Sequence, residues 1–173
     1  MEKGLKDDGV LVAGFDPPHN GHLWLIEQGI LKYNQIYLAA SKNIGRNYEF
    51  SIEERLEMLT EITKPYGNAI IDYLKPGQFS VDYAREKGAR YILRGLRNIE
   101  DFVNEQDMYD HNRRFAPEIM TDFLMAPEEN RIISSTRIRE LVHLQPWEER
   151  VRPLVPGVVY EKLLERYGNA ASQ

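Results

Sequence analysis

Short apolar runs alternate with amphipathic helical stretches along most of this chain of 173 residues. Several of these runs contain no polar position, as is typical of strands that helices cover on both faces. The alternation predicts an α/β fold, in which a doubly wound, Rossmann-like sheet of five parallel strands carries helices on both faces and is followed by a C-terminal helical segment. The predicted strands are residues 10–13, 36–40, 69–73, 91–93 and 122–125.

The predicted helices begin near Gly21, Ser51, Ser80 and Asn98, and two more cover residues 137–142 and 158–167. The second of them has the clearest start, because Ser51 followed three residues later by Glu54 fits a capping box. We expect one domain over residues 1–173, a length that can bury a sizeable core. Residues 1–8 and 168–173 are expected to be flexible tails.

The composition excludes several classes of protein. A net charge of −5 argues against a nucleic-acid partner, which calls for a basic surface. No apolar run approaches the roughly 18 to 20 residues of a membrane span, and the N-terminus has no segment of signal-peptide length. The chain has no cysteine, so it has no disulfide, thiolate nucleophile or zinc–thiolate site. These features favour a cytoplasmic protein without a membrane partner.

Residues 13–22 join the first strand to the first helix and contain His19 and His22, one helical turn apart. At a helix N-terminus the backbone N–H groups lack partners and the helix dipole is positive, so an anion is bound favourably there. The alternative is a purely structural role, in which a Gly/Pro/Asn cluster forms the tight turn between strand and helix. A metal site would need carboxylates from elsewhere in the chain.

Arg94, Gly95 and Arg97 follow the fourth strand, and guanidinium groups match the geometry of a phosphate. The alternative is that these arginines form surface ion pairs with Glu100, Asp101 or Glu105.

Ser134, Ser135 and Thr136 stand at the start of a helix beyond the fifth strand, where hydroxyl and backbone donors can bind a nucleotide phosphate. Simple N-capping explains them as well. Lys42 and Arg46 follow the second strand in a glycine-containing loop, where either could reach a phosphate or merely be solvated.

Each of these signals is weak alone, but they fall after four different predicted strands and all suit anions. Ligands of doubly wound sheets bind at the carboxyl ends of the strands, near the point where strand order reverses. No Ser/His/Asp set, activated Cys or paired carboxylates competes with this reading. A site of His, Lys, Arg, hydroxyls and helix termini stabilises charge, which is what phosphoryl or nucleotidyl transfer requires.

Residues 14–22, 94–97 and 133–136 resemble the motifs of the nucleotidyltransferase superfamily that carries H-x-G-H or T-x-G-H. Within it, the chain is most similar to the phosphopantetheine adenylyltransferase family over about residues 10–165. That likeness rests on residues 50–55, on R-G-L-R at 94–97 with Asp101, Phe102 and Glu105, and on A-P-E-I at 116–119 followed by F-L-M at 123–125.

The resemblance implies transfer of AMP from ATP to 4′-phosphopantetheine, giving dephospho-coenzyme A and pyrophosphate by in-line attack without a covalent intermediate. The acceptor phosphate has a second pKa of about 6, so it needs no general base at neutral pH. Magnesium would arrive with ATP, since the sequence shows no dedicated metal cluster. The resemblance also implies a homo-oligomer, a hexamer, with contacts from the helix after Arg97.

The resemblance assigns catalytic roles to His22, Lys42 and Arg97. The implied ATP contacts are Gly14, Phe15, His19, His22, Gly95, Arg97, Glu105, Ser134, Ser135 and Thr136. The implied acceptor contacts are Gly14, Lys42, Arg46, Ser80 and Arg94. His22 would stabilise charge at the α-phosphorus, His19 would support its loop, and Lys42 would bridge the acceptor phosphate and the transition state.

Three departures from the family pattern concern the acceptor. Gly14 stands where the family usually has Thr or Ser, and Ser80 stands where it has Leu or Met. The loop of Lys42 is about two residues longer than usual, so Arg46 is an alternative to Lys42. The competing functions are transfer to another phosphate acceptor, such as nicotinate or nicotinamide mononucleotide, and non-catalytic nucleotide binding. The R-G-L-R segment argues against the first, and retention of the His, Arg and Ser-Ser-Thr groups argues against the second.

Overall fold

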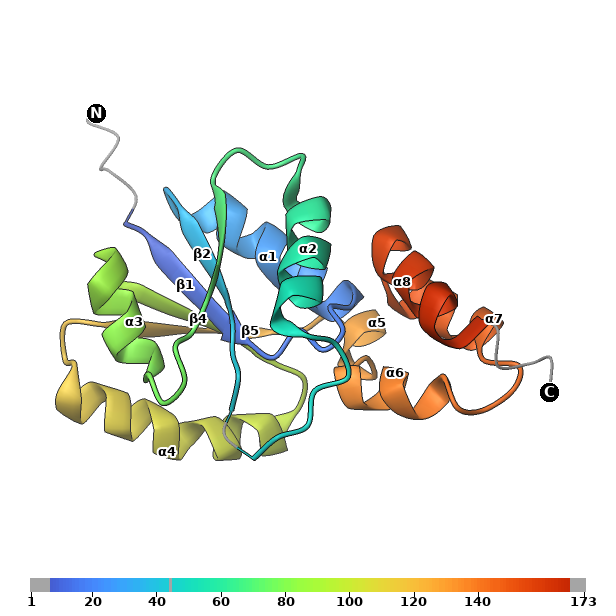
Figure 1. The fold of residues 1–173 in the computed structure, drawn as a ribbon. Helices are drawn as coiled ribbons and strands as arrows, with labels where there is room; N and C mark the ends of the chain where they lie inside the picture. Colours follow the sequence, from blue (N-terminus) through green and yellow to red (C-terminus); the bar gives the residue numbers. More distant parts are fainter. Residues whose placement is uncertain (1–6, 44, 169–173) are drawn as a thin grey trace.

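The computed structural model describes residues 7–43 and 45–168. Its sheet has five strands in the order β3-β2-β1-β4-β5, and every neighbouring pair is parallel (Figure 1). The strands are β1 Gly9–Ala13, β2 Ile36–Ala40, β3 Ala69–Tyr73, β4 Tyr91–Leu96 and β5 Met120–Met125. The predicted doubly wound parallel sheet is confirmed. β4 is longer than predicted because its pairing with β5 continues through Arg94 and Gly95 to Leu96.

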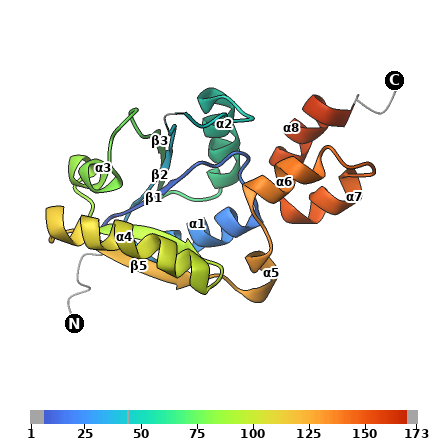
Figure 2. The ribbon, with the colours of Figure 1, turned by 90° about the horizontal axis from the view of Figure 1, so that it is seen from below.

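The helices begin close to the predicted positions. They are α1 Asn20–Lys32, α2 Ile52–Thr63, α3 Ser80–Lys87, α4 Ile99–Phe115, α5 Glu128–Arg131, α6 Ser135–Leu141, α7 Glu148–Val151 and α8 Gly157–Tyr167, with a 3-10 turn at Arg152–Leu154. The sequence pattern missed α5 and α7, because one helical turn is too short to show a periodicity. Figure 2 shows α6, α7 and α8 grouped on one side of the molecule, away from α3 and α4.

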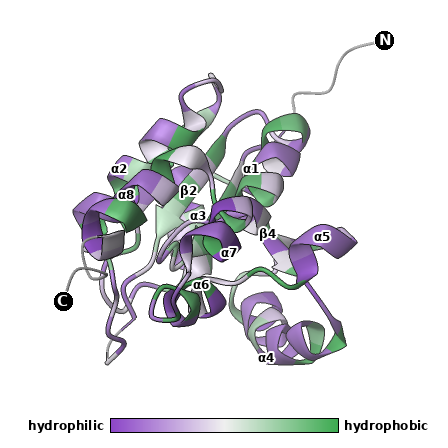
Figure 3. Ribbon diagram, turned by 90° about the vertical axis from the view of Figure 1, so that its right-hand side faces the viewer, coloured by the Kyte–Doolittle hydropathy of each residue, from purple (hydrophilic) through white to green (hydrophobic). Residues whose placement is uncertain are grey.

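The two faces of β1 belong to two different cores. Val10 and Val12 pack in a cluster with residues of α3, while Leu11 packs in a cluster with residues of α1 and α2. Alternate residues of a strand point to opposite faces, so helices cover this sheet on both sides. A third cluster surrounds the buried Trp147 and joins α6, α7 and α8. Figure 3 shows hydrophobic and hydrophilic residues together along α8, as expected of a helix that turns one side to a core.

β1 pairs with β2 on one side and with β4 on the other, so the strand order reverses at β1. The loops that follow β1 and β4 therefore emerge side by side at the carboxyl edge of the sheet.

The expected tails lie mostly outside the described residues, but the carboxylate of Asp8 accepts a hydrogen bond from the backbone N–H of Gln35 at 3.0 Å. Within the described chain, no helix combines the length and the apolarity that crossing a membrane requires.

The predicted capping box of α2 is present. The Ser51 hydroxyl accepts the Glu54 N–H at 3.2 Å, and the Glu54 carboxylate accepts the Ser51 N–H at 2.7 Å. These bonds satisfy N–H groups that a helix start otherwise leaves without partners.

Replacing Ser51 with Ala is expected to destabilise the protein by about 1 kcal/mol, because the hydroxyl acceptor is lost. In a thermal unfolding experiment the midpoint should fall by about 2–4 °C. Ser51→Asp keeps an acceptor and should stay close to the wild type. Equal midpoints for Ser51→Ala and the wild type would show that the cap contributes nothing.

Candidate active site

A cavity of about 630 Å³ opens at the carboxyl ends of β1 and β4. Most of the residues that the sequence singled out line it, namely Gly14, Phe15, His19, His22, Arg46, Ser80, Arg94, Gly95, Arg97, Ser134, Ser135 and Thr136. Lys42 is exposed and Glu105 is half-buried, and neither is among the residues that line the cavity. The structure therefore brings the four predicted anion loops together around one space.

The loop between β1 and α1 stacks its two histidines. His19 is the N-cap of α1, and its Nδ1 accepts the backbone N–H of His22 at 3.3 Å. The ring centroids of the two histidines lie 3.7 Å apart, and the buried ring of Phe15 lies 4.8 Å from His22. Because Nδ1 of His19 is an acceptor, the neutral ring carries its proton on Nε2. No described residue accepts from this N–H, so His19 can offer it to a ligand.

Both histidines are neutral in the free protein. Burial, followed by the neighbouring His22 and Arg97, holds the pKa of His19 well below its usual value. Burial and then Arg97 lower the pKa of His22 to about 3. Nδ1 of His22 is buried and has no hydrogen-bond partner among the described residues. An entering phosphate would add negative charge beside these rings and would favour their protonation.

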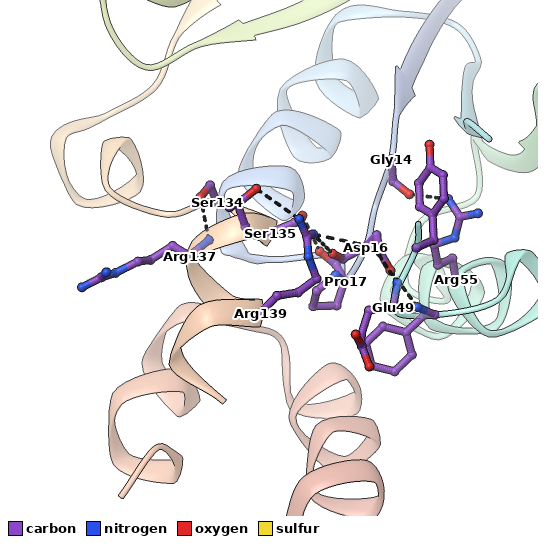
Figure 4. Close-up of polar contacts among 12 residues, drawn as sticks. Gly14, Asp16, Pro17, Glu49, Arg55, Ser134, Ser135, Arg137 and Arg139 are labelled. Carbon is purple, nitrogen blue, oxygen red and sulfur yellow. Dashed lines mark hydrogen bonds and ion pairs between the residues drawn. The ribbon is translucent and has the colours of Figure 1, made fainter. Parts of the chain in front are cut away.

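Asp16 fastens the same loop to two other segments of the chain (Figure 4). Its fully buried carboxylate accepts the backbone N–H groups of Glu49 at 2.9 Å and Phe50 at 2.8 Å. Arg139 on α6 donates to the Asp16 carbonyl at 2.5 Å and also lies 3.6 Å from its carboxylate. The sequence contained Asp16 only as part of a motif, and its role depends on partners more than 30 residues away.

Arg55 on α2 holds the ends of two strands together. Its side chain is buried, and its Nη1 donates to the carbonyl of Gly14 at 2.6 Å and to the carbonyl of Ser41 at 2.8 Å. Its guanidinium carbon lies 4.2 Å from the centre of the Tyr48 ring. The carbonyls that follow β1 and β2 are thereby fixed at the rim of the cavity.

The hydroxyl residues near α6 divide between capping and bridging. Ser134 is the N-cap of α6, so the capping alternative is correct for this residue. The Ser135 hydroxyl donates to the Pro17 carbonyl at 2.9 Å and links α6 to the loop of the histidines. The Thr136 hydroxyl accepts from Arg139 at 3.2 Å. All three still line the cavity.

Arg94 and Arg97 form the ion pairs that the sequence allowed, and both also line the cavity. Arg94 makes a two-pronged ion pair with Glu105 and donates to the Val12 carbonyl at 3.0 Å. Arg97 donates to Asp101 through Nε and Nη2, at 2.9 Å each, and this contact lowers the pKa of Asp101. The pairs fix both guanidinium planes in place, with N–H donors to spare.

The sequence matches a family model and several relatives of known name. The model of the cytidylyltransferase-like family matches residues 10–141, which contain all four loops. A phosphopantetheine adenylyltransferase of Neisseria meningitidis is 39% identical over 158 residues, covering 91% of this chain and 92% of the relative. The chain belongs to the phosphopantetheine adenylyltransferase family. Another family member, from Chromobacterium violaceum, is 35% identical over 91% of this chain and 96% of its own length.

Solved structures support the fold of this family member. The nicotinic acid mononucleotide adenylyltransferase of Plasmodium falciparum, complexed with NaAD, superposes with a TM-score of 0.71 over 97% of this chain and 98% of its own. A nicotinate-nucleotide adenylyltransferase structure from Vibrio parahaemolyticus gives a TM-score of 0.62 over 92% of this chain and 99% of its own. Their identities of 10% and 18% show a common fold and no more.

The lowered pKa of His22 predicts a pH dependence of stability. Between about pH 6.5 and pH 3 the unfolded chain binds a proton at this residue and the folded protein does not, so stability falls as the pH falls. Near pH 5 the free energy of unfolding, measured with urea, should decrease as the pH is lowered. This decrease should be smaller in His22→Gln than in the wild type, by up to about 1.4 kcal/mol per pH unit. Above pH 7.5 the two slopes should agree. Equal slopes at pH 5 would contradict a neutral His22.

Proposed function

We propose that this protein transfers the adenylyl group of ATP to 4′-phosphopantetheine, giving dephospho-coenzyme A and pyrophosphate, a step of coenzyme A biosynthesis. One observation carries the proposal: no carboxylate of the described residues lines the cavity, whose polar lining consists of histidines, arginines, amides and hydroxyls. Such a space suits two phosphorylated substrates together. The relatives that cover nine-tenths of the chain are named for this activity.

The reaction needs little acid–base chemistry from the protein. An oxygen of the acceptor phosphate attacks the α-phosphorus of ATP, a new P–O bond forms, and the bond to the bridging oxygen of the β-phosphate breaks, releasing pyrophosphate. The acceptor is already largely dianionic at neutral pH, because its second pKa is about 6. The work of the protein is to hold two anions in line and to stabilise the charge of the transition state.

Each side chain then has a place in this proposal. His22 and the N-terminus of α1 contact the α-phosphate, with His19 supporting them from the N-cap position. Arg97 and the hydroxyl residues 134–136 contact the β- and γ-phosphates. Arg94 holds the acceptor side, and Glu105 contributes by fixing Arg94. Lys42 reaches the acceptor phosphate from outside the cavity rim.

The apolar part of the cavity favours an acceptor with a long arm. Leu74, Phe79 and Met108 line the cavity, as does Ser80, and Phe79 is 54% exposed. The pantetheine arm would cover this surface, whereas nicotinate mononucleotide has no comparable arm. Burial of exposed apolar surface contributes roughly 25 cal/mol per Å².

Magnesium enters with ATP in this proposal. Within the described residues, no group of three or more His, Cys, Asp or Glu is arranged to hold a metal ion. The phosphates of ATP would carry the cation into the cavity, where Mg²⁺ would screen their charge.

We also propose a homo-oligomer, a hexamer by family resemblance, in the cytoplasm. α4 has one buried residue, Asn112, and exposes Ile99, Phe102, Val103 and Phe115. A helix that is so poorly buried in the subunit suits a contact with another copy.

Pyrophosphate release from ATP and Mg²⁺, measured with a panel of acceptors, tests the proposed function. We expect turnover with 4′-phosphopantetheine and none with nicotinate or nicotinamide mononucleotide. Turnover with a mononucleotide alone would favour the other acceptor class. ATP binding without turnover on any acceptor would favour a non-catalytic nucleotide-binding protein.

His22→Ala is expected to lower kcat by about 10²-fold or more, because a donor to the charge that develops at the α-phosphorus is lost. Its thermal midpoint at pH 8 should stay near that of the wild type. His143→Ala is the matched control, since His143 is exposed and does not line the cavity. An unchanged kcat in His22→Ala would remove His22 from the charge-stabilising role.

A further inference from the structure

Three arginines line the cavity, and they differ in their partners. Arg94 and Arg97 are each held by a carboxylate. In the described part of the chain, the Arg46 guanidinium has neither an ion pair nor a hydrogen bond, and its carbon lies 5.1 Å from the centre of the Tyr48 ring. Arg46 is therefore the cavity arginine whose donors are all available to an anion that enters.

The Arg46 guanidinium lies beside the one position of the first loop that has no side chain. A Cβ placed on Gly14 would be 3.9 Å from Nη1 of Arg46 and 3.6 Å from Cε1 of Tyr48. Gly14 has no side chain, so it offers no side-chain donor at this part of the rim. The guanidinium brings N–H donors to the same place from the loop after β2.

The ring of Tyr48 is itself held from two directions. Its hydroxyl accepts the backbone N–H of Asn43 at 2.9 Å, and the Asn43 carbonyl accepts the backbone N–H of Arg46 at 3.3 Å. The guanidinium of Arg55 lies 4.2 Å from the ring centre and is fixed in turn by the carbonyl of Gly14. An aromatic face attracts a guanidinium, so this fixed ring gives Arg46 a resting place at the rim.

We propose that Tyr48 is a positioning residue that holds the Arg46 guanidinium beside Gly14, where Arg46 binds the phosphate of the acceptor. The proposal rests on the function proposed above and deepens it on the acceptor side. Arg46 supplies the side-chain donors that Gly14 lacks, and Tyr48 acts only through Arg46. The nucleotide side of the cavity, at Arg97, does not depend on either residue.

Steady-state kinetics with ATP and 4′-phosphopantetheine test this arrangement. Arg46→Ala and Tyr48→Leu should each raise the KM for 4′-phosphopantetheine about tenfold, with the KM for ATP within about twofold of the wild type, because a charge-assisted contact is lost on one side only. Tyr48→Phe keeps the ring and should restore most of the acceptor affinity. The matched control is Asn47→Ala, in the same exposed loop and outside the cavity lining.

The double variant Arg46→Ala/Tyr48→Leu separates positioning from a general structural role. If Tyr48 acts through Arg46, the double variant should be no worse than Arg46→Ala by more than about twofold. Additive effects, or equal increases in both KM values, would overturn the positioning role. If the wild type turns over 4′-phosphopantetheine and Arg46→Ala has the same KM for this acceptor as the wild type, this inference alone is overturned. A wild type inactive with that acceptor would overturn the proposed function and this inference together.

Discussion

The buried carboxylate of Asp16 connects three segments on which the site depends. The carboxylate accepts the backbone N–H groups of residues 49 and 50. Arg139 of α6 contacts both the backbone carbonyl and the carboxylate of Asp16. The loop of the histidines, the loop before α2 and α6 therefore keep fixed relative positions. A buried carboxylate is costly unless it is paired and hydrogen-bonded, so these partners are a condition for its presence. Figure 4 shows these contacts between the segments.

The cationic groups around the cavity also have partners within the protein. Arg55 donates to backbone carbonyls. Arg94 and Arg97 are held by carboxylates that do not line the cavity. The histidines are neutral because they are buried next to a cation. Apart from Arg46, the described cationic groups that line the cavity are therefore paired or neutral, while N–H donors still line a space without carboxylates. Two phosphorylated substrates supply the negative charge that this lining lacks.

Local sequence patterns predicted the sheet because the central strands are apolar on both faces. β4 was predicted too short since Arg94 and Gly95 break the apolar run, although pairing with β5 continues through them. The anion loops were also predictable, because in a doubly wound sheet their position follows from the strand order. The roles of Asp16 and Arg55 were not, since their partners lie 34 and 41 residues away and only tertiary structure brings them together. For the same reason the sequence left Lys42 and Arg46 as equal candidates, and the structure lines the cavity with Arg46.

A crystal structure with 4′-phosphopantetheine and an ATP analogue that carries a methylene bridge between the α- and β-phosphorus atoms tests the central claim most directly. The account predicts the α-phosphate within about 3 Å of the His22 ring and the acceptor phosphate within about 3 Å of a guanidinium nitrogen of Arg46. A triphosphate bound instead on Asn98, Met125 and Arg131, in the cleft that shares only Arg97 with the cavity, and away from His22, would contradict it.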